Sequence, residues 1–438
     1  MTTAASSVDV VVVGGGPGGS VCASRLVQKG LSVRVFEKEE FPRFHLGESL
    51  LPQSLPVLDA IGVLPAVREQ FIFKYGARFH DDVKGRKDRF AFADAWKNEH
   101  PHAFQVPRDL FDALLLDHAK KVGAQVHERA RVLRILREGT RAVGVEVESE
   151  SGPVETVHAR FVVDASGRDA MTAHTSRTTT KIDGLDQTAI FGQFRGVQRP
   201  EGELAGDIDI VLFREDSGAR PNWFWFIPFK DGRTSVGAVV SRAWIKDRRA
   251  RLAAEGFAGH EADGLFARAV AESKSATELL AGATNIWPSA RATADFSYRV
   301  RDLHGDGWVA VGDAGGFIDP LFSTGAHVAM VSGMTAADAI VAALENPSSE
   351  KETFAAWQTA MRSGAETFIL AVQSFYAGPL VEYLFAENKH TALRRSITSL
   401  LAGDVFTDSI WLRDARTRLR DMLAQPGAAT TLDPSKLA

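Results

Sequence analysis

The apolar positions near the N-terminus follow the pattern of a buried strand, a helix and a second strand. Residues 8–13 form a short run dominated by valine, which is typical of a strand buried in a parallel sheet. A glycine-rich turn follows, and then a helix from about Gly18 to Lys29. Gly30 ends this helix before a second strand at 31–36. This order predicts a βαβ unit.

Farther along the chain, the spacing of apolar residues changes twice. Residues 50–130 are expected to mix helical and irregular segments. Between about 180 and 300 the expected strands are longer and alternate, which indicates a mixed sheet that forms a second layer. From about 350 to 424 the pattern is helical and amphipathic. The other elements belong with the βαβ unit: a helix near 109–121, a strand pair around 125–149, buried strands at 161–164 and 308–313, and a helix at 327–345.

These elements predict an α/β fold in which a Rossmann-like domain is interleaved with a mixed-sheet domain, and a C-terminal helical cap follows. We expect the Rossmann-like domain to be discontinuous, with 75–107 lying partly in the second layer. The tail is rich in Pro, Gly, Ala and Thr and is expected to be flexible. The expected boundaries are 1–180 with 290–348 for the first domain, 181–289 for the second, 349–424 for the cap and 425–438 for the tail.

Composition excludes several classes of protein. The 438 residues are 45% apolar, which is enough for a sizeable core, and a formal charge of −4 gives no indication of nucleic acid or a membrane surface. Cys22 is the single cysteine, so no internal disulfide can form and a reducing compartment fits. We find no signal peptide, and no stretch reaches the roughly 18 to 20 apolar residues of a membrane span. We therefore expect a cytoplasmic protein, and we predict no metal site.

Three glycines between the first strand and the first helix form a dinucleotide-binding fingerprint. Gly14, Gly16 and Gly19 satisfy G-x-G-x-x-G. The first permits a tight turn, the second lets a pyrophosphate approach the N–H groups of the helix N-terminus, and the third lets helix and strand pack closely. Glu37 ends the second strand, where a carboxylate accepts hydrogen bonds from a ribose hydroxyl. The fingerprint alone does not distinguish FAD from NAD.

Two further motifs at strand ends carry a resemblance to a known family. Residues 163–168 (Val-Asp-Ala-Ser-Gly-Arg) and 311–314 (Val-Gly-Asp-Ala) complete a pattern that resembles the flavoprotein monooxygenase superfamily, with the fold of p-hydroxybenzoate hydroxylase. The resemblance runs from residue 8 to about 345 and implies that the Rossmann-like domain binds FAD. It also implies flavin contacts from Arg43, Glu48, Ser49, Arg108, Asp164, Gly167, Gly312 and Asp313.

The sequence does not determine which molecule reduces the flavin. No second glycine fingerprint occurs in the sequence, so there is no separate nicotinamide domain. Either NAD(P)H docks transiently on the flavin, or a separate NAD(P)H-dependent flavin reductase supplies FADH2.

Residues 223–228 (Trp-Phe-Trp-Phe-Ile-Pro) match W-x-W-x-I-P, which resembles the hallmark of flavin-dependent halogenases. Alternate residues of a strand share a face, so Trp223, Trp225 and Ile227 are expected to line one side, with Pro228 at the strand end. The resemblance implies that the two indoles lie near the flavin tunnel and hinder the substrate from reaching the flavin.

Lys74, in the apolar segment 71–79, matches the catalytic lysine of that family. The resemblance implies that its amine hydrogen-bonds hypohalous acid, or forms a haloamine, and so directs the halogen to one carbon. Burial would lower the pKa of this amine and make it more nucleophilic.

The turn at 320–325 precedes a helix, which is a position where backbone N–H groups bind anions. The resemblance implies a halide at the amides of Thr324 and Gly325, although related hydroxylases use the same turn to hold the flavin ring. Phe322 stands where tryptophan halogenases have a glutamate, and this departure favours the phenol and pyrrole halogenases. A phenol must lose its proton, and the candidate bases are His45, His80, His102 and His327.

The sequence thus predicts an FADH2-dependent halogenase. It would use O2 and chloride or bromide to make hypohalous acid, which Lys74 directs to a phenol or pyrrole in natural-product biosynthesis. The substrate would be free or tethered to a carrier protein. The alternative is an FAD-dependent aromatic hydroxylase, or a reductase, of the same fold; a hydroxylase would have its flavin reduced by NAD(P)H without a partner protein, and no halide would enter the product. A third class is a binding protein of this fold without catalytic activity, against which the intact glycines argue.

Overall fold

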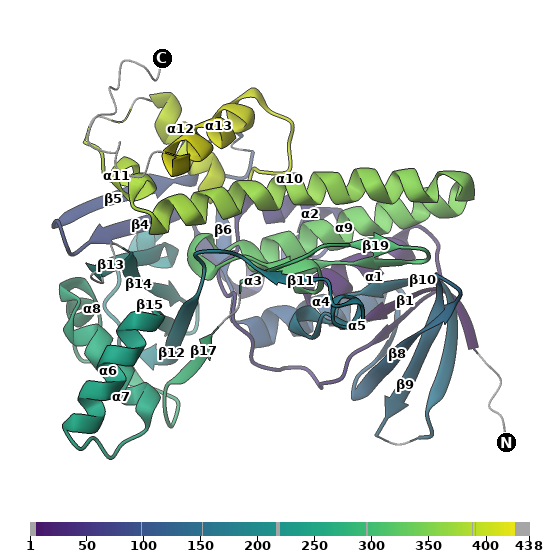
Figure 1. The fold of residues 1–438 in the computed structure, drawn as a ribbon, viewed down its shortest axis with the longest axis horizontal. Helices are drawn as coiled ribbons and strands as arrows, with labels where there is room; N and C mark the ends of the chain where they lie inside the picture. The colour runs from purple at the N-terminus through teal and green to yellow at the C-terminus, as the bar shows by residue number, and fades with distance from the viewer. Residues whose placement is uncertain are drawn as a thin grey trace.

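The fold is described from a computed structural model that covers residues 6–424, apart from 98, 151, 216–219, 295, 296, 388 and 390. The tail at 425–438, expected to be flexible, lies outside the described residues. Two eight-stranded sheets, a set of helices packed on them and a C-terminal group of helices make up the molecule (Figure 1). The mixed α/β architecture predicted from the sequence is confirmed.

The first sheet contains the predicted βαβ unit. Its central strands run parallel in the order β20-β10-β1-β2-β7, and the antiparallel hairpin β8-β9 extends from β10. The strands are β1 (Ser6–Val13), β2 (Val33–Phe36), β7 (Gln125–His127), β8 (Ala130–Glu138), β9 (Arg141–Ser149), β10 (Glu155–Asp164), β19 (His304–Gly305) and β20 (Trp308–Ala310).

Both faces of β1 are covered, which explains its unbroken run of valines. Val10 and Val12 pack among helices α1 (Pro17–Gln28), α4 (Arg108–Val122) and α9 (Thr324–Glu345). Val11 and Val13 face the β8-β9 hairpin on the other side. A strand with two buried faces needs apolar residues at every position rather than at alternate positions.

The second sheet has the order β16-β12-β15-β14-β13-β4-β5, with β17 also paired to β12. It is mixed, because β13 runs parallel to β4 while the other pairs are antiparallel. The strands are β4 (Gly76–Asp81), β5 (Arg86–Ala91), β12 (Gln187–Arg195), β13 (Ile208–Glu215), β14 (Pro221–Pro228), β15 (Arg233–Ser241), β16 (Thr284–Asn285) and β17 (Arg291–Ala294).

Two features of this second layer differ from the prediction. Strands β4 and β5 lie in the segment 75–107, which was expected to lie partly in this layer but to be helical or irregular, although β4 alternates buried Ala77 and Phe79 with more polar neighbours. Helices α6 (Arg242–Ala254), α7 (Glu261–Ala271) and α8 (Lys274–Leu279) lie where only strands were predicted, and they cover the outer face of the sheet. The hydroxyl of Ser241 caps α6 by accepting a hydrogen bond from Trp244 N, a signal that the sequence contains.

The C-terminal segment is helical, as predicted. In Figure 1, α10 (Glu350–Tyr376) crosses the upper part of the molecule beside α9, and α11 (Pro379–Leu384), α12 (Thr391–Leu401) and α13 (Ile410–Ala424) gather around its C-terminal half, with α12 and α13 above it. Among the described helices, α9 alone is long and apolar enough to suit a membrane span, and 56% of its most apolar stretch is buried inside the protein. Its apolar character is therefore consistent with a core position.

The remaining elements are short and connect the larger layers. They are α2 (Leu55–Ala60), α3 (Leu64–Gln70), α5 (Met171–Ser176), β3 (Ile72–Lys74), β6 (Ala103–Gln105), β11 (Thr179–Lys181), β18 (Tyr298–Val300) and β21 (Gly316–Phe317). Strand β3 pairs with β6, and this two-stranded sheet holds Lys74 at its end.

Helices α1 and α9 pack closely against each other because each has a glycine at the contact. A Cβ at Gly333 of α9 would lie 2.2 Å from the backbone oxygen of Gly18, so no larger residue fits without separating the helices. We expect Gly333→Ala to lower the free energy of unfolding by about 1–3 kcal/mol through overpacking, as measured by urea denaturation. Gly152→Ala is the control, because its Cβ would meet only the Ser149 hydroxyl at 3.5 Å. Equal stability of Gly333→Ala and wild type would contradict the close approach of the helices.

Candidate active site

A single cavity of about 1090 Å³ is lined by residues of both large sheets. It brings together most of the residues singled out from the sequence. These are Gly14, Gly16, Glu37, Arg43, Glu48, Ser49, Arg108, Gly167, Trp223, Trp225, Ile227, Gly312, Asp313, Thr324 and Gly325. Gly19, Lys74, Asp164 and Pro228 are not part of the cavity lining.

The glycine turn forms one end of the cavity. Gly14 has φ +103°, and a Cβ there would lie 2.3 Å from Ala165 O, while a Cβ at Gly19 would lie 2.0 Å from Gly14 O. At Gly16 the nearest atom to such a Cβ is an Arg43 nitrogen at 3.8 Å, so this position is open to a ligand. No side chain caps α1. The N–H groups of its first turn are therefore available to a pyrophosphate, which fits FAD.

Glu37 is buried and tied to this turn. Its Oε2 accepts a hydrogen bond from Gly15 N at 2.7 Å, and its Oε1 accepts one from Glu39 N at 2.9 Å. The carboxylate therefore has a fixed position at the end of β2, beside the glycine turn, where the sequence places a ribose contact.

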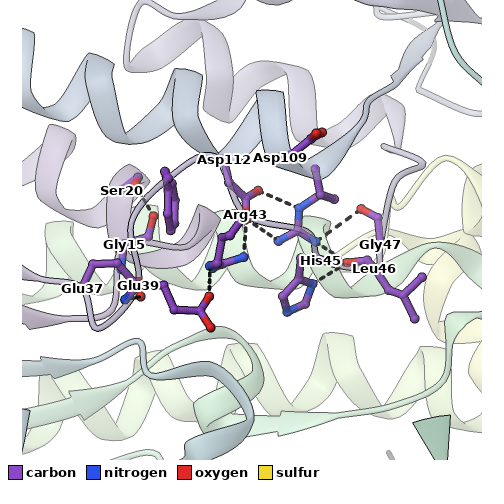
Figure 2. A network of polar contacts seen from close by, with 12 residues as sticks. Gly15, Ser20, Glu37, Glu39, Arg43, His45, Leu46, Gly47, Asp109 and Asp112 are labelled. Atoms are coloured by element: carbon purple, nitrogen blue, oxygen red, sulfur yellow. Dashed lines mark hydrogen bonds and ion pairs between the residues drawn. The ribbon is translucent and has the colours of Figure 1, made fainter. Parts of the chain in front are cut away.

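Two arginines on the cavity wall share one carboxylate. Arg108 donates from Nε and Nη2 to the two oxygens of Asp112 at 2.6 and 2.9 Å. Arg43 lies between Glu39 and Asp112, at 2.9 and 3.4 Å (Figure 2). Asp112 is fully buried and was not predicted as a site residue, because only the fold brings Arg43 close to α4.

Asp164 lies behind the cavity rather than in its wall. Its oxygens accept hydrogen bonds from Ser166 N at 3.1 Å and from both the N and Oγ1 of Thr172 at 2.7 Å. These bonds hold the turn that carries Gly167, which has φ +64° and does line the cavity. The structure thus gives Asp164 a positioning contact with this turn.

The two tryptophans face the cavity together, as the alternation along a strand predicts. Trp223, Trp225 and Ile227 of β14 line it, while Phe224 and Phe226 pack against the helices on the opposite face. Gly237 is the register partner of Trp225 on β15, and a Cβ there would lie 2.2 Å from the indole. The indole therefore needs glycine beneath it. Pro228 ends the strand and does not reach the cavity.

A chain of hydrogen bonds anchors Trp223 to the C-terminal helices. Trp223 Nε1 donates to Tyr376 Oη at 2.9 Å, and Tyr376 donates to Asp319 Oδ2 at 3.1 Å. Leu321 N donates to the other Asp319 oxygen at 2.9 Å. An indole can only donate, so the direction of this chain is fixed. Sequence patterns could not predict it, because its members are far apart in the chain.

Lys74 is buried just outside the cavity, behind Ser49. Only 2% of the residue is exposed, and Nζ donates to Ser49 Oγ at 2.9 Å and to Leu50 O at 3.1 Å. The ammonium also lies 5.1 Å from the centre of the Phe92 ring, and among the described residues it forms no ion pair. Burial lowers the pKa of Lys74 to about 7, against the opposing charge of Asp207.

The turn at 320–325 forms part of the cavity wall. Ser323 adopts φ +56°, and α9 begins at Thr324 without a side-chain cap. Thr324 and Gly325 therefore present the first N–H groups of a long helix to the cavity. Phe322 is buried against Phe375, away from the cavity lining.

Of the four candidate bases, only His45 lines the cavity. Its Nδ1 lies 2.6 Å from Leu46 O, and burial lowers the pKa of its imidazole to about 4. His80 is bound to Asp209, and His327 lies between Ser54 and Gly403 O. His102 packs against the aromatic rings of Phe73 and Phe104. Three of these histidines therefore have their contacts outside the cavity, and His45 is the candidate base in its wall.

Comparison with known proteins identifies relatives of this chain. Residues 7–351 match the FAD binding domain family. The chain is 30% identical to a 1H-pyrrole-2-carbonyl-[peptidyl-carrier protein] chlorinase of Pseudomonas fluorescens, over 98% of this chain and 95% of that protein. It is 34% identical to a tryptophan 2-halogenase of Chondromyces crocatus, over 85% of this chain and 68% of that protein.

Two solved structures share the fold of this chain over nearly its whole length. A flavin-dependent brominase superposes with a TM-score of 0.83 at 25% identity, over 96% of this chain and 98% of that chain. A flavoprotein/dehydrogenase from Cytophaga hutchinsonii superposes with the same TM-score at 31% identity, over 95% and 99% of the two chains.

The lowered pKa of Lys74 has a consequence for stability. The pKa is about 7 in the folded protein and near 10.5 when the lysine is solvated, so between these values the unfolded chain binds more protons. We therefore expect the free energy of unfolding to rise with pH over this range, by at most about 1.4 kcal/mol per pH unit.

Lys74→Met removes the titrating amine and provides the reference. We expect the stability difference between wild type and this variant, measured by urea denaturation, to change in favour of wild type as the pH rises from 7 toward 10.5. A difference that stays constant with pH would show that the amine remains charged in the folded protein.

Proposed function

This chain belongs to the flavin-dependent halogenases, and from that premise we propose that it halogenates an electron-rich phenol or pyrrole, with Lys74 directing the halogen. FAD is its cofactor and a halide its co-substrate. Reduced FAD, when bound, supplies with O2 the oxidising power that converts chloride or bromide to hypohalous acid. The observation that carries the proposal is the buried amine of Lys74 on the far side of Ser49 from the tryptophan-lined cavity.

Different parts of the cavity wall fit FAD and the halide. The open turn at Gly16 and the first N–H groups of α1 would hold the pyrophosphate, and Glu37 would hold the ribose. Arg43 and Arg108 would add positive charge near the flavin. The N-terminus of α9, at Thr324 and Gly325, would bind the halide.

The indoles of Trp223 and Trp225 restrict what can approach the flavin. Both are nearly fully buried, and each is held by a hydrogen bond from its ring nitrogen, to Tyr376 and to Ser235 respectively. Fixed rings of this size can exclude an aromatic substrate while a small molecule passes. This favours halogenation over direct hydroxylation of the ring.

Lys74 has the chemistry that the final step needs. Its pKa near 7 leaves a large share of the amine uncharged at neutral pH, so it can hydrogen-bond hypohalous acid or accept the halogen on nitrogen. Ser49 lines the cavity and binds this amine directly. Hypohalous acid that reaches Ser49 is therefore one side chain away from Lys74.

Phenols and pyrroles are the substrate class that the site favours. Phe322 provides no carboxylate, and a ring that already donates electrons to the attacked carbon needs less assistance. One relative is named for a pyrrole held on a carrier protein, so the substrate is either free or tethered in this way. We further propose that a separate NAD(P)H-dependent flavin reductase supplies FADH2, and that the enzyme acts in the cytoplasm in natural-product biosynthesis.

The test is mass spectrometry of turnover mixtures that contain the protein, FAD, a flavin reductase, NADH, O2 and chloride or bromide. The mixtures would offer phenols and pyrroles, both free and carrier-bound. We expect wild type to give products with a chlorine or bromine isotope pattern, and Lys74→Ala to lose at least about 100-fold in product formation.

Lys274→Ala is the matched control, because the side chain of Lys274 is 83% exposed and lies outside the cavity lining. It should behave as wild type. Products that gain oxygen without halogen, in wild type and in Lys74→Ala alike, would favour the aromatic hydroxylase instead. Reduction of the bound flavin by NADH without the reductase would point the same way.

A further inference from the structure

The C-terminal helix α10 reaches the cavity wall through the hydroxyl of its last residue, Tyr376. This residue is buried, with 3% of its surface exposed. Its hydroxyl accepts a hydrogen bond from Trp223 Nε1 at 2.9 Å and donates one to Asp319 Oδ2 at 3.1 Å. One oxygen atom therefore connects an indole of the cavity wall to the residue that precedes the turn at 320–325.

Asp319 in turn fixes the conformation of that turn. Its other oxygen accepts a hydrogen bond from Leu321 N at 2.9 Å, so the side chain caps the short 3₁₀ helix Pro320–Phe322 that leads to Thr324. Burial raises the pKa of Asp319 to about 7, and the hydrogen bonds from Leu321 N and Tyr376 lower it. A buried carboxylate depends on such donors, and the Tyr376 hydroxyl is one of the two.

We propose that Tyr376 is a positioning residue for halogenation, which couples the halide turn to the indole of Trp223, so that halide binding and the orientation of this ring depend on each other. The inference rests on the proposed function, which assigns the halide to the amides of Thr324 and Gly325. Tyr376 lies outside the cavity lining and acts through Trp223 and Asp319.

The polarity of this connection leaves no alternative partner for either end. An indole nitrogen can only donate, so the Tyr376 oxygen accepts from Trp223 and directs its own proton to Asp319. Burial and the charge of Asp319 raise the pKa of Tyr376, so the hydroxyl keeps its proton at neutral pH. Tyr376→Phe would therefore remove the acceptor of a buried indole and a donor to a buried carboxylate at once.

A second contact joins the same end of α10 to the turn. The ring of Phe375 meets the ring of Phe322 edge-on, with the ring centroids 6.4 Å apart. This apolar contact does not involve the Tyr376 hydroxyl. Tyr376→Phe should therefore leave α10 packed on the turn and remove only the polar connection, which makes the variant a test of coupling rather than of folding.

The connection matters for the outcome of the reaction. Trp223 lines the cavity from one side, and Thr324 and Gly325 line it at the N-terminus of α9. If the indole reorients or the turn shifts, FADH2 can pass its two electrons and two protons to O2 without oxidising a halide, which gives FAD and hydrogen peroxide. The share of FADH2 that yields halogenated product therefore measures how well the two parts of the cavity are held together.

The first measurement follows the indole directly. The chain has eight tryptophans, so nuclear magnetic resonance of the FAD-bound protein with isotope-labelled tryptophan resolves a small set of indole N–H signals, and Trp223→Phe identifies that of Trp223. We expect bromide to shift this signal in wild type. Tyr376→Phe should move the signal without halide and abolish its response to bromide, even at tenfold higher bromide.

Two controls belong to this titration. Gluconate at the same ionic strength shows the effect of salt alone. The indole of Trp244, which donates to Glu272 on the outer face of the second sheet, should respond neither to bromide nor to Tyr376→Phe.

The second measurement uses turnover. Halogenated product and hydrogen peroxide are measured per FADH2 as the bromide concentration is varied. We expect Tyr376→Phe to raise the KM for bromide roughly tenfold, equivalent to about 1.4 kcal/mol, and to form hydrogen peroxide at the expense of product, with an unchanged KM for the aromatic substrate. Asp319→Asn combined with Tyr376→Phe should cost no more than the larger single effect, because both residues act through one connection.

Tyr383→Phe is the matched control for turnover. It also removes a tyrosine hydroxyl from a buried residue of the C-terminal helices, but within the described parts of the chain this hydroxyl on α11 makes no hydrogen bond. The variant should keep the wild-type KM for bromide and the wild-type yield of hydrogen peroxide.

Several results would overturn the proposal. These are a Trp223 signal that ignores bromide in wild type, a bromide response that persists in Tyr376→Phe, or an unchanged KM for bromide in that variant. A parallel loss of FAD affinity, measured by flavin fluorescence, would also overturn it, because Tyr376 would then support the whole cavity. If wild type forms no halogenated product, the proposed function fails, whereas the bromide response of Trp223 still decides whether Tyr376 couples the turn to the indole.

Discussion

Helices α1 and α9 approach so closely that a Cβ at Gly333 would meet the backbone oxygen of Gly18 at 2.2 Å. This contact packs the middle of α9 against the start of α1, although the two are some three hundred residues apart in the chain, and the first residues of both helices line the same cavity. The cavity depends on it, because one helix presents its first N–H groups to the proposed pyrophosphate and the other presents them to the proposed halide. If α1 and α9 were farther apart, their N-termini would no longer line one cavity.

The cavity and Lys74 are separated by one layer of side chains. Ser49 forms part of the wall and at the same time accepts a hydrogen bond from the lysine. Burial outweighs the opposing charges of Asp207 on Lys74 and of Arg108 on Glu48, and it lowers the pKa of the amine and raises that of the carboxyl, each to about 7. Perturbed pKa values of this kind cluster at functional sites, which supports the proposed role of Lys74 at this centre.

The C-terminal helices take part in the geometry of this centre. Tyr376, at the end of α10, joins Trp223 of the second sheet to Asp319, which precedes the turn at Thr324. The helical segment that covers the sheets is thus bonded to a tryptophan of the cavity and to the proposed halide turn at once. Variation in this segment among relatives would change the cavity through these bonds as well as through its shape.

The sequence by itself determined the βαβ unit, the glycine turn, the common face of Trp223, Trp225 and Ile227, and the helical C-terminus, because each depends on neighbours within a few residues. It did not reveal β4, β5 or helices α6–α8, where the local pattern is short or ambiguous. Only the tertiary structure decided that Lys74 lies behind Ser49, that Asp112 joins two arginines, and that Glu48 has a free oxygen in the cavity. Those facts depend on burial and on contacts between distant segments, and no local pattern of residues encodes either of them.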